Sequence, residues 1–178
     1  MLGDISNIHD NSDLIYILTA TLVVDMIIIL IARDTTFFGR MVNTWYNKFT
    51  LTAVILDVLI IVIGFVITRY IFSIYNIKFK PEIFIIILLA VQIIHDILFY
   101  MLVIVPYPKG NNQIMDVYKE YADEHGYKII LGDSAMVITS ALLAMYLKNK
   151  EMHETTSLLI LTVYIIPYFL YQKVKFLI

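Results

Sequence analysis

Apolar residues fall into five long runs that are separated by polar segments. These runs cover residues 14–32, 51–68, 82–105, 129–147 and 157–171. Each approaches the ~20 residues that a helix needs to cross a hydrocarbon layer of about 30 Å. The pattern predicts an all-α fold, a polytopic membrane helical bundle of about five transmembrane helices, with residues 1–178 as a single integral membrane domain.

Three prolines, and the polar leader before the first run, refine the predicted ends of the helices. Pro81 stands at a helix-starting position, where a missing backbone N–H costs least, and Pro106 ends the third run. Pro167 is expected to kink the fifth run. The leader "GDISNIHDNSD" has three aspartates and no basic residue, so the first run is predicted to be a permanent helix rather than a signal peptide.

The polar segments differ in what they predict. Residues 33–50 are expected to form a loop whose Trp45, Tyr46 and Phe49 lie at the interface between water and lipid. The segment 106–128 opens with turn-forming residues and then repeats apolar side chains at helical spacing. It is predicted to contain a short amphipathic helix that lies on the membrane surface or against the bundle.

Five spans place the two termini on opposite sides of the membrane, and basic residues indicate which side is which. With the amino terminus outside, the inner segments hold eight basic residues: Arg33, Arg40, Lys48, Lys109, Lys119, Lys128, Lys173 and Lys175. The outer segments hold five: Arg69, Lys78, Lys80, Lys148 and Lys150. This bias favours a cytoplasmic carboxyl terminus.

Composition supports a membrane protein and excludes several classes of site. Hydrophobic residues make up 60% of the chain, above the roughly 45–50% of ordinary soluble domains. The absence of cysteine excludes disulfides, thiol catalysis and thiolate metal sites. Basic residues are scattered among 15 acidic ones, so nucleic-acid binding is not expected.

Each of the first four runs carries an aspartate where a spanning helix should avoid one. A charged side chain at the centre of a membrane costs about 2.5–3.5 kcal/mol on insertion scales, so such residues normally turn inward and find partners. The four acids are therefore expected to converge on a common interior. They are Asp25, Asp57, Asp96 and Asp133.

Helical spacing adds further polar residues to this interior. Gln92, His95 and Asp96 lie at positions i, i+3 and i+4 and share one helix face, with Tyr100 one turn further along. Asp133 and Ser140 stand two turns apart on a common face of the fourth run. The eight residues are predicted to form an interior polar network or an ion path.

Alternative interpretations of this network remain open. Hydrogen bonds between helices are a common way to hold spanning helices together, which would make the network purely structural. Four acids and one histidine also suit a proton or cation path, or a catalytic centre. No HExxH motif or comparable ligand pair is present, and "GDS" at 132–134 lacks a declared base, so no metal site, cofactor or catalytic residue is predicted.

The block from His95 to Leu147 resembles a family of uncharacterised multi-pass membrane proteins of nucleocytoplasmic large DNA viruses, the giant viruses of algae and amoebae. The shared features are an "HD-x-x-FY" segment, a "P-x-PKG-x-N" turn, a "YKEYA-x-E-x-G" helix and an "LGDS-x-M" entry to the next span. The resemblance implies a host membrane or a virion inner membrane, such as the lipid layer beneath a capsid. It implies no activity.

The favoured functional hypothesis is a non-enzymatic structural or scaffolding membrane component. Its expected partners are the lipid bilayer and a capsid or other membrane protein, contacted through residues 106–128, and a homo-oligomer is a further option. The first alternative is a proton- or cation-coupled transporter or channel that uses the intramembrane aspartates and His95. The second alternative is a lipid-modifying membrane enzyme.

Overall fold

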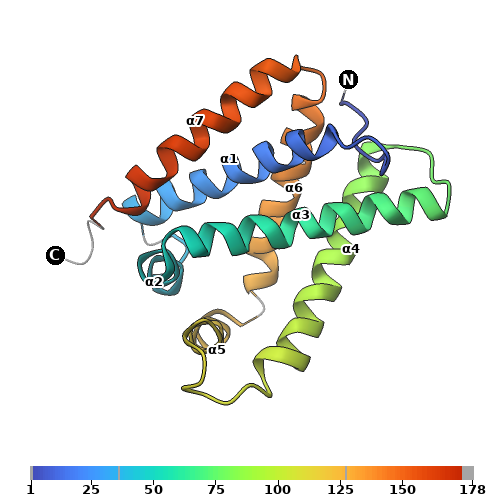
Figure 1. Cartoon of the computed structure of the whole chain (residues 1–178). Helices are drawn as coiled ribbons and strands as arrows, with labels where there is room; N and C mark the ends of the chain where they lie inside the picture. Colours follow the sequence, from blue (N-terminus) through green and yellow to red (C-terminus); the bar gives the residue numbers. More distant parts are fainter. Residues whose placement is uncertain (1, 36, 127, 174–178) are drawn as a thin grey trace.

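The computed structural model describes residues 2–35, 37–126 and 128–173, and within this part every regular element is helical. In these three ranges, seven α-helices and one π-helical turn follow one another (Figure 1). They are α1 (Asp13–Asp34), α2 (Arg40–Phe49), α3 (Leu51–Ile74), α4 (Pro81–Phe99), η1 (Tyr100–Ile104), α5 (Gln113–His125), α6 (Lys128–Leu147) and α7 (Met152–Leu170).

The predicted all-α class and the five spans are confirmed. Five helices of the described chain are long and apolar enough to cross a membrane: α1, α3, α4 continued by η1, α6 and α7. Their bounds lie close to those of the apolar runs. The largest differences are at α3, which ends at Ile74 rather than at residue 68, and at α7, which begins at Met152 rather than near Ser157. The Glu151 backbone N–H donates to the Glu154 carboxylate (3.3 Å), a capping interaction that starts the helix earlier than hydrophobicity alone indicates.

The expectation of a loop over residues 33–50 is wrong, because α2 occupies more than half of that segment. Its apolar residues recur at helical spacing, with Met41 and Val42 followed by Trp45 and Phe49. These side chains pack into one of the two hydrophobic clusters of the bundle. The predicted amphipathic helix of the 106–128 segment is present as α5, with the Asn112 side chain accepting from the backbone N–H of Ile114 (2.8 Å).

Four spanning helices form a ring, in which each helix packs against two neighbours. Helix α1 packs against α3 and α6, and α4 packs against the same two helices from the other side. Helix α7 stands outside the ring and lies along α1 (Figure 1). The Arg33 Nη2 atom donates to the Leu170 carbonyl (2.6 Å), so α7 ends beside the end of α1. The two helices therefore run in the same direction.

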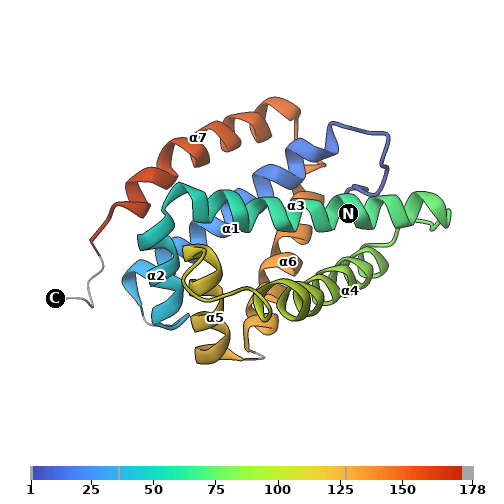
Figure 2. The ribbon, with the colours of Figure 1, turned by 60° about the horizontal axis from the view of Figure 1, so that its bottom comes forward.

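The two ends of the bundle are closed in different ways. At one end α2 and α5 pack against each other and against ring helices, and Figure 2 shows them side by side. We call α2 and α5 the platform. At the other end, which we call the latch end, residues 2–12 fold across the bundle near the end of α3 and the end of α6. Between the ends, Phe84 packs with Phe65 and Phe72 in a dry aromatic cluster nearer the latch end.

Candidate functional site

The aspartate ring, which we define as Asp25, Asp57, Asp96 and Asp133, contributes one carboxylate from each helix of the four-helix ring. Each acid lies in the half of its helix nearer the platform. At about 1.5 Å of rise per residue, all four lie within roughly 14 Å of that end. The charge of Asp57 reaches both Asp25 and Asp133, and the charge of Asp96 also reaches Asp133. The four acids are therefore neighbours in space.

Two of these acids hold α2. The Tyr46 hydroxyl donates to Asp25 Oδ1 (2.7 Å), and the Trp45 ring N–H donates to Asp57 Oδ2 (2.9 Å). Asp25 is completely buried, and Tyr46 is only 3% exposed. Because Asp25 belongs to α1 and Asp57 to α3, these bonds attach the platform helix to two different spanning helices.

Tyr46 also links the two acids to each other. Its hydroxyl contacts the carboxylate of Asp57 as well as that of Asp25. Burial, and then the charges of Asp57 and Asp25, raise the pKa of Tyr46 well above its usual range. The phenol therefore keeps its proton and acts as a hydrogen-bond donor between two carboxylates.

On α4, the predicted face brings three polar side chains together. The Gln92 amide donates to Asp96 Oδ1 (2.7 Å), and His95 Nδ1 lies 3.1 Å from the same oxygen. The His95 ring stacks on Phe99 with their centroids 5.6 Å apart. Tyr100 lies apart from this group and is 44% exposed. It begins the π-helical turn, where Val105 N bonds to Tyr100 O (2.9 Å) five residues back.

On α6, Asp133 and Ser140 differ in their surroundings. No described side chain or backbone group forms a hydrogen bond with the Asp133 carboxylate. Ser140 is completely buried, and its hydroxyl has no hydrogen-bond partner within the described chain. The predicted helix face is present, but no bond joins these two residues to the rest of the network.

Two tyrosines of α5 lie over the platform side of the aspartate ring. Burial is the first cause that raises the pKa of Tyr118 and of Tyr121 above the usual range. The charges of Asp57 and Asp133 add to the shift in both cases. The rings of Tyr118 and Trp45 pack with centroids 5.0 Å apart, so α5 and α2 meet directly above the acids.

Two buried carboxylate oxygens of the aspartate ring have no hydrogen-bond partner among the described residues. Oδ2 of Asp25 and Oδ2 of Asp96 are both buried without a hydrogen bond from the residues that the structure describes. Over residues 2–35, 37–126 and 128–173, no group of three or more His, Cys, Asp or Glu side chains is arranged to hold a metal ion. Hydrogen bonds of the acids also do not join one spanning helix to another, since they run to α2 or stay within α4.

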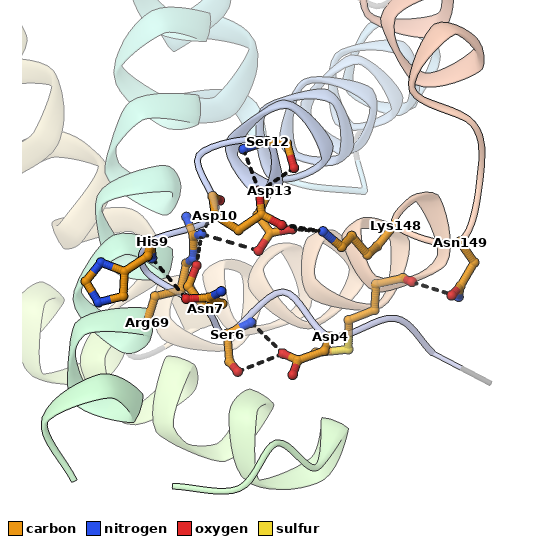
Figure 3. A network of polar contacts seen from close by, with 11 residues as sticks. Asp4, Ser6, Asn7, His9, Asp10, Ser12, Asp13, Arg69, Lys148 and Asn149 are labelled. Carbon is orange, nitrogen blue, oxygen red and sulfur yellow. Dashed lines mark hydrogen bonds and ion pairs between the residues drawn. The ribbon is translucent and has the colours of Figure 1, made fainter. Parts of the chain in front are cut away.

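A second polar cluster escaped the sequence-based prediction. We call it the latch and define it as Asp10, Asp13, Arg69 and Lys148 (Figure 3). Lys148 Nζ lies 2.6 Å from Asp13 Oδ1 and 2.9 Å from Asp10 Oδ2. Arg69 Nη2 lies 3.3 Å from Asp13 Oδ2 and donates to the Asp10 carbonyl (2.7 Å). The latch therefore joins the leader to the ends of α3 and α6.

The latch contains two acidic and two basic side chains. The pKa values of Asp10 and Lys148, which lie outside the spanning helices, are shifted by their contacts in this cluster. Hydrogen bonds from Ser12, and then from Lys148, lower the pKa of Asp10 to about 2. For Lys148, partial burial lowers the pKa, but hydrogen bonds to Asp13 and Asp10 outweigh it and the pKa is raised. The signal that could have indicated the latch is Arg69 itself, because an arginine within an apolar run needs a partner, and the acidic leader offers one.

The leader is folded rather than loose. Gly3 N donates to the Met145 carbonyl (2.8 Å), and Ile5 is completely buried. A Cβ at Gly3 would lie 2.7 Å from Lys148 Cβ, so only glycine allows this close approach. Asp4 and Asp10 each accept from the backbone N–H two residues later, at 2.8 Å and 3.0 Å, which closes two tight turns.

No protein-family model, curated protein or solved structure matches this chain.

Proposed function

We propose that this protein is an integral multi-pass membrane protein with a non-enzymatic structural or scaffolding role, and that its platform binds a partner protein. One observation carries the proposal. Trp45 and Tyr46 attach α2 to Asp57 of α3 and Asp25 of α1, so two acids of the spanning helices, one of them completely buried, hold the platform in one position. A fixed surface of this kind suits a docking role, because little conformational freedom is lost when a partner binds.

Further bonds support a rigid platform. The Asn43 side chain donates to the Ala32 carbonyl (2.7 Å), and Arg33 donates to the Asn47 side chain. Lys119 Nζ of α5 donates to the carbonyl of Tyr107 in the preceding loop (2.5 Å). The end of α1 is thus tied to α2, and α5 is tied to the loop before it, by bonds within the protein.

The outer side of α5 gives the proposed partner its chemistry. Glu120, Asp123 and Glu124 are exposed on this helix, which makes that surface acidic. An acidic patch favours a partner with a basic surface. Together with the resemblance to giant-virus proteins, this supports a capsid or other membrane-associated viral protein as the partner, and a host or virion inner membrane as the location.

Photo-crosslinking tests the proposal. A photoreactive amino acid at Glu120 is compared with the same probe at Ile160, an exposed residue of the spanning helix α7. In membranes from the native setting, we expect the probe at Glu120 to capture a discrete protein and the probe at Ile160 to capture lipid. Capture of lipid alone at both positions would contradict the docking role.

A second candidate function, proton- or cation-coupled transport, is favoured by different residues. Asp133 has no hydrogen bond from the described chain, and the bonds of Asp96 stay within its own helix, so holding helices together does not account for either acid. Flux into proteoliposomes that disappears in Asp96→Asn and His95→Ala, but persists in Asp116→Asn of α5, would establish transport. No observation favours the lipid-modifying alternative, which stays a prediction from the sequence.

A further inference from the structure

We propose that Asp25 and Asp57, bridged by the hydroxyl of Tyr46, form a proton-binding site, and that this pair keeps one proton at neutral pH while α2 is docked. The site is independent of the scaffolding role, since holding a proton requires no partner protein. Binding forms one O–H bond on a carboxylate oxygen and removes one negative charge from the interior of the bundle.

The number of hydrogen-bond donors between Asp25 and Asp57 supports a bound proton. A phenol carries one hydrogen-bonding proton and can give it to one acceptor at a time in a linear bond. Tyr46 donates to Asp25 Oδ1 (2.7 Å), yet its oxygen also contacts the Asp57 carboxyl. That second contact becomes a hydrogen bond only when the Asp57 carboxyl holds a proton of its own, or when the proton lies on Asp25 and Tyr46 donates to Asp57.

The charges around Asp25 and Asp57 also favour a bound proton. Two ionised carboxylates that share one phenol repel each other strongly in a membrane interior of low dielectric. Among the described residues, the titratable groups that face the pair include no lysine or arginine. They are Tyr46 of α2, Tyr118 and Tyr121 of α5, Asp133 of α6, and Asp96 of α4 with its own partner His95.

The remaining neighbours do not change this balance. The buried residues that α7 turns toward α1 are Thr155, Thr162, Ile166 and Leu170, and none of them titrates. Arg33, two turns beyond Asp25 on α1, uses its guanidinium to bind Asn47 and the Leu170 carbonyl. A proton is therefore the cation that the pair can take up without a further ligand.

The Oδ2 atom of Asp25 also favours a bound proton. Asp25 is completely buried, and its Oδ2 atom has no hydrogen-bond partner among the described residues. An ionised carboxylate needs its lone pairs satisfied, and a buried charge without partners costs far more than a buried neutral group. This unpartnered oxygen is accounted for when the carboxyl pair is partly protonated.

Infrared spectroscopy tests the site directly, because a protonated carboxyl group has a carbonyl stretch distinct from that of a carboxylate. The native protein is reconstituted in lipid nanodiscs with isotopically labelled aspartate at neutral pH. We expect a protonated aspartate band that is lost in Asp25→Asn and in Asp57→Asn. The matched control, Asp10→Asn in the latch, should keep the band.

Tyr46→Phe provides a second readout that keeps both acids. Removal of the bridging hydroxyl should shift the band in frequency, because the protonated carboxyl loses its hydrogen-bond partner. The proposal is overturned if the native protein has no protonated aspartate band. It is also overturned if the band disappears only in Asp96→Asn or Asp133→Asn, which would assign the proton to the other acids. The native spectrum is informative even where a variant fails to fold.

Discussion

The latch and the aspartate ring contain similar acids in similar helices, but their charges are handled in opposite ways. In the latch, Asp13 meets both Arg69 and Lys148, and the bonds join three segments that are distant in sequence. In the aspartate ring, the described acids meet phenol, indole, amide and imidazole groups and no arginine or lysine. The comparison teaches that an acid within a spanning segment can be compensated by a cation or by a proton, and that the neighbours decide which.

The largest effect on stability is expected from Arg69→Met. This substitution removes the guanidinium of the latch, on a side chain that is only 1% exposed. Breaking a buried ion pair from one side typically costs about 3–5 kcal/mol, because the partner charge stays buried. We expect a loss of this size in the free energy of unfolding, measured by titration with denaturing detergent. Lys150→Met, at an exposed lysine of the same end, serves as the control. Equal stability of the two variants would contradict the structural role of the latch.

A smaller loss is expected from Tyr46→Phe at the platform. The substitution removes one hydrogen bond and leaves buried carboxyl oxygens without a donor, which typically costs about 1–3 kcal/mol. Because Trp45 is the lone tryptophan, its fluorescence reports whether α2 stays docked. We expect its emission to move to longer wavelength as the indole gains water. The control is Tyr168→Phe on the exposed side of α7, and equal emission in both variants would show that Tyr46 does not hold α2.

Two glycines should respond in opposite directions. Gly3→Ala introduces a Cβ 2.7 Å from Lys148 Cβ and should cost about 1–3 kcal/mol through overpacking. Gly132→Ala places a methyl group in open space within α6 and should stabilise the helix by about 0.5–1 kcal/mol. Hydrogen exchange of residues 3–12 should accelerate only in the Gly3 variant. Unchanged exchange there would mean that the leader does not depend on this close contact.

The smallest effect is expected from pH, because the groups of the latch that lie outside the spans titrate far from neutrality. The pKa of Asp10 is lowered to about 2, so its contribution is present above the unfolded value of 3.8 and is lost as pH falls through about 2. The pKa of Lys148 is raised, so its contribution is present below 10.5 and is lost at higher pH. The stability difference between the native protein and Lys148→Met should therefore be flat across neutral pH. A clear slope near neutrality would contradict this assignment.

The sequence predicted the spans well because length and hydrophobicity decide them locally. It also located α5, since Ile114, Val117 and Tyr118 recur at helical spacing and α5 has a clear start. The same kind of spacing was present in α2, where Trp45 and Tyr46 were interpreted as interfacial aromatic residues of a loop. Their true partners, Asp25 and Asp57, are identified only when the helices are assembled.

The latch could not be predicted from local pattern, because its partners are separated by 56 positions for Arg69 and Asp13 and by 138 for Lys148 and Asp10. The structure also changes the count of loop charges. Arg33 lies within α1, Lys128 within α6 and Arg69 within α3, so the inner and outer counts become six (8 − 2) and four (5 − 1). The cytoplasmic position of the carboxyl terminus stays a prediction.

The most direct test of the difference between the two acid clusters is the free energy of unfolding of Asp13→Asn against Asp57→Asn at neutral pH, measured in the same detergent. Asparagine resembles a protonated aspartate, so at position 13 it should leave Arg69 without a charged partner and Lys148 with Asp10 alone. At position 57 it should fit a site whose described neighbours include no arginine or lysine. We predict a loss of about 3–5 kcal/mol for Asp13→Asn and little loss for Asp57→Asn. Equal losses, or a larger loss at Asp57, would contradict the account.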